Sequence, residues 1–191
     1  MDSMVPRPRR WRLRAALLAA LSVTLACGNG LQAVPAEPAA ALDLARFEGR
    51  WYVIARAPAD DPHPRAAYFE YRARSPGRIE GVYASRESFE RAPVTEARDV
   101  EFDPAMPAKW RVRSGWFGRD DQWVLYVSPD YRFALAGSPS HDVAWVLARE
   151  PVIPEWSYAG LLARLALQGY DVSRFRRVPQ QPEQIGRPGF D

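Results

Sequence analysis

The alternation of hydrophobic and polar residues becomes regular at about residue 49. In Gly49–Arg56, Trp51, Val53 and Ala55 fall on one face of an extended chain, and Tyr52, Ile54 and Arg56 fall on the other. Seven more segments rich in β-branched and aromatic residues follow at short spacing: 66–74, 78–86, 93–102, 109–114, 122–128, 131–137 and 142–149. The pattern therefore predicts eight β-strands.

Short turn-forming sequences rich in Pro, Gly, Asp and Ser separate these strands, which favours hairpin connections. From Pro154 to Gly169 the period becomes helical, with Tyr158, Leu161, Leu162 and Leu165 on one face. The predicted fold is all-β. It is an eight-stranded antiparallel up-and-down β-barrel with one C-terminal α-helix packed on the outside and a short final strand at 170–175.

The N-terminal residues have the pattern of an export signal. Arg7–Arg14 are rich in positive charge, and Ala15–Ala26 are apolar but shorter than the ~20 residues of a membrane-spanning helix. Val23–Gly28 is similar to a lipobox, in which Cys27 would be lipidated; the alternative is a plain secretory signal with an incidental cysteine. Gly28 favours the outer membrane over retention in the inner membrane.

These patterns divide the chain into four parts. We expect a lipoprotein signal peptide at 1–26, a flexible linker at 27–41, a folded domain at 42–178 and a loose C-terminal tail at 179–191. We see no internal repeat and no second domain.

Charge and chemistry narrow the function. The net charge of +3 includes five arginines and one aspartate within the first 26 residues, so the remainder carries −1 and does not indicate nucleic-acid binding. His63 and His141 stand far apart, and Glu70, Glu80 and Glu96 alternate as outward-facing strand residues should. We therefore expect no catalytic residue, no metal site and no cofactor.

Three short motifs give the chain a resemblance to a known family. Gly49-x-Trp51-Tyr52 opens the first strand, Ser128-Pro129-Asp130-Tyr131 links the sixth and seventh, and Arg149-x-Pro151 follows the eighth. Together, over about residues 42–178, they resemble the lipocalins, and in particular the bacterial lipocalins anchored to the outer membrane. The resemblance implies that Gly49, Trp51, Asp130, Tyr131 and Arg149 are structural, with the Arg149 side chain packed over the Trp51 ring at the barrel floor.

The resemblance also implies a small ligand inside the barrel. Alternation counted from Trp51 predicts the residues that line it: Val53, Ala55, Phe69, Tyr71, Gly81, Tyr83, Trp110, Val112, Val124 and Tyr126. Arginines near the rim, such as Arg65 or Arg113, could meet a carboxylate or phosphate head group. Val53 stands where the bacterial relatives usually have Glu, which favours a more apolar cavity.

The expected function is that of a carrier anchored in the outer membrane, facing the periplasm or the cell surface. Its expected partners are a fatty acid or lysophospholipid and, through the lipid anchor, the membrane; homodimer formation is left open. The alternatives are an enzyme built in the same barrel, acting through an inward polar residue such as Tyr83 or Gln122, and an envelope protein whose barrel is filled and whose surface binds a partner. The identity of the ligand stays open.

Overall fold

The computed structural model describes residues 34–58, 63–114 and 118–190. The signal peptide and Cys27 therefore lie outside the described residues. The first elements are helix α1 (Leu44–Phe47) and strand β1 (Gly49–Ala57), and a short strand and two 3₁₀ turns follow the long helix near the C-terminus. The other elements are β2 (Arg65–Ser75), β3 (Arg78–Arg86), β4 (Val94–Phe102), β5 (Lys109–Ser114), β6 (Gly118–Val127), β7 (Phe133–Gly137), β8 (Ala144–Ala148), α2 (Glu155–Leu167), η1 (Val172–Arg174), β9 (Arg176–Arg177) and η2 (Pro182–Gln184).

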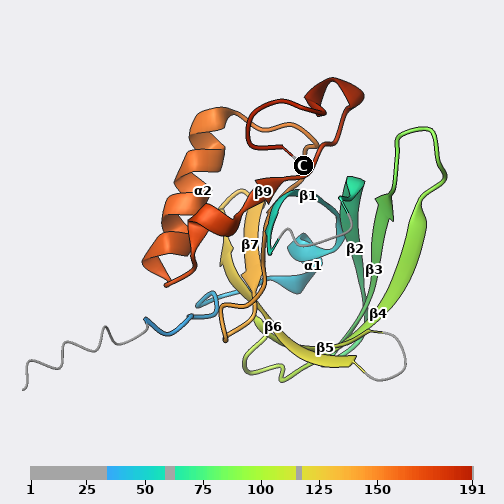
Figure 1. The fold of residues 1–191 in the computed structure, drawn as a ribbon. Coiled ribbons are helices and arrows are strands. Elements are labelled where there is room, and N and C mark those ends of the chain that lie inside the picture. Colours follow the sequence, from blue (N-terminus) through green and yellow to red (C-terminus); the bar gives the residue numbers. More distant parts are fainter. Residues whose placement is uncertain (1–33, 59–62, 115–117, 191) are drawn as a thin grey trace, which may run out of the picture. The chain divides into compact units, whose positions relative to one another are not determined.

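The predicted barrel is confirmed. Each strand from β2 to β8 pairs antiparallel with the next, β8 pairs with β1, and β1 returns to β2, which closes the sheet (Figure 1). Closure removes the exposed edges that would otherwise pair with other chains. The connections place one end of the barrel at Gly49 and the 128–132 turn, and the opposite, open end at the 138–143 loop.

Two β-bulges reverse the alternation inside the barrel wall. The register shifts between Val53 and Ala55 on β1, and between Val124 and Tyr126 on β6. A bulge inserts one extra residue into a strand, so every later side chain moves to the other face. Val53 and Val124 consequently belong to the core inside the barrel, whereas Ala55 and Tyr126 pack into a second core outside it.

Helix α2 covers the second core, as the helical period predicted. Leu161 and Leu165 are buried against β-strand residues, and Tyr158 and Leu162 are partly buried beside them. Figure 1 shows α2 on one side of the barrel and β3 and β4 on the side away from it. No helix among the described residues is long and apolar enough to cross a membrane.

The C-terminal segment corrects two predictions. Residues 172–174 form a 3₁₀ turn, so the final strand lies at Arg176–Arg177, beside β1, rather than at 170–175. Residues 179 and 180 are not loose: the Gln180 amide donates from Nε2 to the backbone oxygens of Val53 (2.8 Å) and Ala67 (3.1 Å). β1 and β2 pair directly only over Gly49–Tyr52, and this segment bridges them where they separate.

The predicted linker is partly ordered as well. Ala36 is buried in the core under α2, and the Ala39 amide donates to the Val124 carbonyl oxygen at 2.8 Å. The Glu37 amide donates to Oε1 of Gln168, just after α2, at 3.2 Å. Residues 34–41 are therefore part of the folded domain, and the stretch between Cys27 and the domain is shorter than predicted.

Candidate functional site: the open end of the barrel

The closed end of the barrel is held by the predicted pair. The Arg149 guanidinium lies 3.9 Å from the centre of the Trp51 ring and donates to the backbone oxygens of Arg50 (2.8 Å) and Arg46 (2.7 Å). Gly49 has φ +90°, and a Cβ there would lie 3.4 Å from Nη1 of Arg149, so glycine both permits the turn and leaves room for the guanidinium. The structural role predicted for these three residues agrees with their contacts.

The 128–132 turn also serves the closed end. The Asp130 carboxylate accepts from the Ser128 hydroxyl (2.5 Å) and the Arg132 amide (3.2 Å), which lowers the pKa of Asp130. Tyr131, at φ 58°, accepts a hydrogen bond from the Asp43 amide on its hydroxyl oxygen at 2.7 Å. This turn therefore fixes the N-terminal segment across the barrel floor.

A continuous cluster of aromatic rings fills the interior above that floor. Phe47 stacks on Trp51 with ring centres 4.7 Å apart, and Tyr71 contacts Trp110 at 5.1 Å and Phe69 at 5.8 Å. A Cβ at Gly81 would lie 3.0 Å from the Tyr71 ring, so the ring occupies the space that a side chain there would need. Packed aromatic side chains therefore occupy this lower part of the barrel.

The open end, in contrast, contains a hollow of about 520 Å³. Val112, Val143 and Trp145 give it an apolar wall, and Arg98 and Gln122 line it from strands β4 and β6. Its other lining residues are Asp120, Asp121, Ser138, Pro139, Ser140 and Asp142. The volume and the mixture of apolar and polar side chains are typical of a site for one small molecule.

Arg98 and Gln122 carry unused hydrogen-bonding capacity. Nη1 of Arg98 donates to Oε1 of Gln122 at 3.3 Å, but Nε of Arg98 and Nε2 of Gln122 are buried and have no hydrogen-bond partner among the described residues. No described carboxylate lies within 4.0 Å of the Arg98 guanidinium. Buried donors without acceptors are costly, and an oxyanion in the hollow would satisfy them.

The charge of Arg98 acts on the aromatic cluster. Its guanidinium carbon lies 5.2 Å from the centre of the Phe69 ring. Burial raises the pKa of Tyr71 to about 12, while the nearby positive charge of Arg98 and, to a smaller extent, the polar side chain of Gln122 oppose that shift. Burial also raises the pKa of Tyr83, against the charges of Arg56 and Arg98. The hollow thus has a positive side next to the aromatic cluster.

The 138–143 loop, which borders the hollow, is held in place by residues that follow α2. The Tyr170 hydroxyl donates to the Ser138 carbonyl oxygen at 2.6 Å, and the Tyr170 side chain lies over Gly137, where a Cβ would come within 2.6 Å of the hydroxyl oxygen and 2.9 Å of the ring. Nε2 of His141 lies 2.8 Å from the Gln168 carbonyl oxygen. These contacts attach the 138–143 loop to the C-terminal end of α2.

Most predicted lining residues face the interior, but few of them border the hollow. Of the ten, Ala55 and Tyr126 are wrongly placed, because the two bulges turn them toward α2. Gly81 faces the Tyr71 ring, and the others belong to or pack against the interior core: Val53, Phe69, Tyr71, Tyr83, Trp110, Val112 and Val124. Only Val112 of the ten lines the hollow; Val53 is fully buried, so its apolar side chain contributes to the core.

Neither of the two predicted rim arginines, Arg65 and Arg113, lines the hollow. Arg113 points to the outer face, where it lies 3.8 Å from Glu101, and Nη1 of Arg65 is 3.3 Å from the carbonyl oxygens of His63 and Pro64. Glu96 was predicted to face outward, but it lies opposite Tyr83 in the β3–β4 register and therefore shares the inward face. Glu70 and Glu80 face outward as predicted and form ion pairs with surface arginines. Arg98 was not predicted from the sequence, because no residues of β4 were assigned to the inside of the barrel. Val100 lies two positions further along β4 and faces the core, so alternation from Val100 would have placed Arg98 inside.

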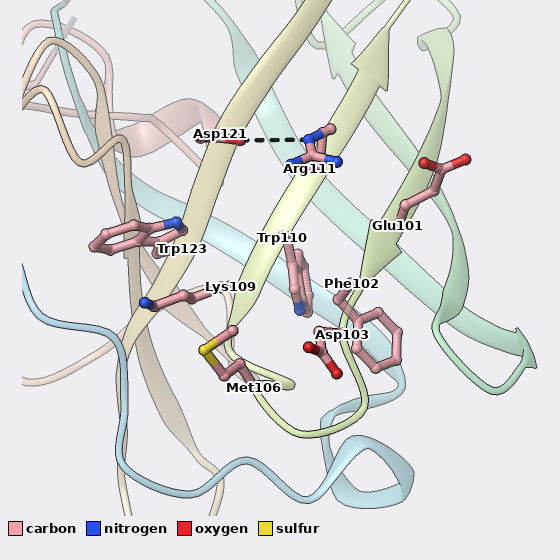
Figure 2. A pocket seen from close by; sticks show the side chains of 9 residues that line it. All are labelled: Glu101, Phe102, Asp103, Met106, Lys109, Trp110, Arg111, Asp121 and Trp123. Carbon is pink, nitrogen blue, oxygen red and sulfur yellow. Dashed lines mark ion pairs between the residues drawn. The ribbon is translucent and has the colours of Figure 1, made fainter.

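A second hollow, of about 440 Å³, lies at the closed end on the outer side of β4–β6 (Figure 2). Its charges are already paired or covered: Arg111 lies 3.9 Å from Asp121, and the Lys109 ammonium lies 5.1 Å from the centre of the Trp123 ring. In Figure 2 these side chains lie across the surface of neighbouring strands. It therefore offers a ligand less unsatisfied chemistry than the open end does.

Metal ligands do not gather in the described part of the chain. No group of three or more His, Cys, Asp or Glu side chains that could hold a metal ion occurs among the residues searched.

Fold and site together define the class of protein: a small antiparallel barrel that is filled at one end and hollow at the other. The chain belongs to the lipocalin-like domain family, whose model matches residues 42–180. Temperature-induced lipocalin-1 of Arabidopsis thaliana is 42% identical over 60 residues, which span 31% of this chain and 32% of the plant protein.

The other relatives match more of the domain. The outer membrane lipoprotein Blc of Escherichia coli (strain K12) is 26% identical over 154 residues, covering 73% of this chain and 80% of Blc. Among solved structures, insecticyanin of the tobacco hornworm Manduca sexta superimposes with a TM-score of 0.57 at 18% identity, covering 77% of this chain and 85% of that one. The structural likeness shows a shared fold, and the sequence match confirms the resemblance to outer-membrane lipocalins.

Proposed function

We propose that the protein is a lipid carrier of the outer membrane, anchored through Cys27, that binds a fatty acid or lysophospholipid in the open-end hollow. The observation that carries the proposal is the pair of unpartnered buried donors, Arg98 Nε and Gln122 Nε2, beside an apolar wall. A ligand that combines an oxyanion with an alkyl chain satisfies both features.

The energies suit such a ligand. Each methylene removed from water against Val112, Val143 or Trp145 contributes ~0.8 kcal/mol. A hydrogen bond from a charged donor to a carboxylate or phosphate contributes about 1.5–3 kcal/mol. Because the aromatic cluster blocks the lower barrel, the hollow favours a lipid with one chain over one with two.

The outer-membrane location is supported by two observations. Val23–Gly28 is similar to a lipobox, and the relative Blc is by name an outer membrane lipoprotein. Storage or transport of single-chain lipids during maintenance of the envelope is the role that this combination favours.

The head-group site is tested with Arg98→Met in protein that has been unfolded, freed of lipid and refolded. Palmitate and hexadecanol, which share a chain and differ in charge, are titrated in parallel. We expect palmitate to bind roughly 10–100-fold more weakly to Arg98→Met, equivalent to the loss of one charge-assisted hydrogen bond, while hexadecanol is unaffected.

The matched control is Arg111→Met, which removes an arginine from the outer face of the neighbouring strand β5. It should bind both ligands as the unaltered protein does. Equal loss of palmitate binding in the two variants would contradict a specific role for Arg98.

The alternative of a filled barrel that binds a partner by its surface has one observation in its favour, the packed aromatic cluster below the hollow. Native mass spectrometry of the refolded protein with added palmitate or lysophosphatidylcholine separates the two. If neither lipid binds, the carrier proposal fails and the filled barrel is favoured.

The anchor has its own test. Cells grown with radioactive palmitate should label the unaltered protein and should not label Cys27→Ala. Equal labelling of both would remove Cys27 as the anchor without affecting the proposed hollow.

A further inference from the structure

Helix α2 carries an apolar stripe on the face that points away from the barrel. Trp156 is 77% exposed and Leu167 is 78% exposed, the two largest exposures among the large hydrophobic side chains of the described residues. Gly160 and Ala163 lie between them and are also exposed. Residues spaced by three, four and seven positions share one face of a helix, so Trp156, Gly160, Ala163 and Leu167 form a single stripe, here named the α2 stripe.

The α2 stripe has little charge of its own. Within the helix only Glu155 and Arg164 are charged, and the Arg164 guanidinium lies 4.3 Å from the centre of the Tyr126 ring, which faces the helix from the barrel. The small side chains at 160 and 163 leave the middle of the stripe flat. A flat apolar stripe with tryptophan at one end and leucine at the other suits the interface of a bilayer, where tryptophan is enriched.

The chain leaves the folded domain beside this helix. A Cβ at Gly169, just after α2, would lie 2.8 Å from the Val34 carbonyl oxygen, and the Glu37 amide bonds to the Gln168 side chain. Val34, the first described residue, is itself 51% exposed. Seven residue steps separate it from Cys27, which can span at most about 25 Å when fully extended.

These observations indicate which surface the α2 stripe contacts. Resting on the proposed anchor at Cys27, we propose that the α2 stripe lies on the surface of the membrane to which that cysteine is attached. The short tether holds the C-terminal end of α2 close to the bilayer, so the stripe binds at high effective concentration. A lipid anchor and a second apolar contact together give the two signals that stable, oriented attachment requires.

Orientation toward the membrane bears on the open end of the barrel. Nε2 of His141 meets the Gln168 carbonyl oxygen, and Tyr170 meets Ser138, so the loop bordering the hollow is attached to the same end of α2 as the tether. With the α2 stripe on the bilayer, the opening of the hollow is held near the lipid surface. A single-chain lipid then enters the barrel without crossing a long path through water.

The test uses the full, lipidated chain in vesicles. Lipidation consumes the thiol of Cys27, the only cysteine, so Leu167→Cys introduces one free thiol for an environment-sensitive fluorophore. In phosphatidylethanolamine–phosphatidylglycerol vesicles we expect blue-shifted emission and strong quenching by a quencher attached to the lipid acyl chains. Thr95→Cys, an exposed site on β4 on the side of the barrel away from α2, is the matched control and should be quenched several-fold less.

The outcomes separate this inference from the anchor on which it rests. Mass spectrometry reports whether Cys27 is acylated; an acylated protein labelled at 167 with no more quenching than at 95 overturns the membrane contact alone. Absence of the acyl mass removes the anchor and the inference together. Emission that is equally blue-shifted in detergent without vesicles, with sedimentation as a dimer, would assign the stripe to a second copy of the chain and overturn the membrane contact.

Discussion

The two ends of the barrel are built from similar residues, yet they use them differently. At the closed end, Trp51 is fully buried, Phe47 stacks on its ring, and the Arg149 guanidinium both covers that ring and donates to two backbone oxygens. At the open end, an arginine also lies near an aromatic ring, Arg98 by Phe69, but it retains a buried donor without a partner. Satisfied polar groups stabilise a fold, whereas unsatisfied ones at a hollow provide binding energy for a ligand.

Tryptophan replaced by alanine at each end gives the strongest test of this difference. Trp51→Ala should lower the free energy of unfolding by ~3–5 kcal/mol, because a fully buried ring leaves a cavity in the packed floor. Trp145→Ala, which removes a half-buried ring from the wall of the hollow, should cost about 1–2 kcal/mol and weaken palmitate binding. Urea unfolding and ligand titration of both variants check this. Equal losses of stability would contradict the division into a structural and a binding end.

The Gln180 side chain bridges the gap between β1 and β2, beside the backbone hydrogen bonds that join Ala66 to Pro179 and Val178 to Ile54. Gln180→Leu keeps a similar volume but removes both hydrogen bonds to the buried Val53 and Ala67 carbonyl oxygens. We expect a loss of about 2–3 kcal/mol in the free energy of unfolding, because two buried acceptors lose their donor. Glu183→Gln, an exposed change in the η2 turn, serves as the control and should be neutral in the same urea titration.

Arg149→Met separates the charge at the floor from its packing. Methionine retains much of the aliphatic contact with Trp51, but it removes the cation–π contact and two backbone hydrogen bonds. The expected loss is about 2 kcal/mol, with ligand affinity unchanged because the floor lies away from the hollow. Arg72→Met removes an arginine from a surface ion pair with Glu70 and should cost much less. A fall in palmitate affinity for Arg149→Met would show that the two ends are coupled.

The sequence predicted the architecture well because the architecture depends on spacing. Alternation and turn residues were sufficient for the strands, and β3 and β5 have the bounds expected for them. The motif residues were sufficient to predict the contact at the barrel floor, where Arg149 packs on Trp51 although almost a hundred residues separate them in the sequence.

The site was less predictable, for physical reasons that particular residues show. A bulge changes the orientation of a strand without changing its composition, so alternation counted from Trp51 placed Ala55 inside the barrel and Tyr126 beside a ligand. Gln180 lies in a segment rich in Pro and Gln that has the composition of a tail, and only the gap between β1 and β2 gives it a role. The unsatisfied donors at the hollow are a property of three-dimensional arrangement, which no local pattern encodes.

Tyr71 lies between the packed closed end and the hollow at the open end of the barrel. Its titration tests whether the charge at the open end affects the packed core, and this is the smallest of the expected effects. Burial raises its pKa to about 12, above the value of about 10 in an unfolded chain, so the folded state retains the phenol proton more tightly. Its contribution to stability is therefore fully present below pH 10 and declines as the pH rises toward 12, by up to about 1.4 kcal/mol per pH unit. In urea titrations at a series of pH values, Tyr71→Phe should show a shallower decline over this range. Because the positive charge of Arg98 holds the pKa of Tyr71 down, Arg98→Met should extend the decline to higher pH; an unchanged profile in that variant would show that the charge at the open end does not reach the packed core.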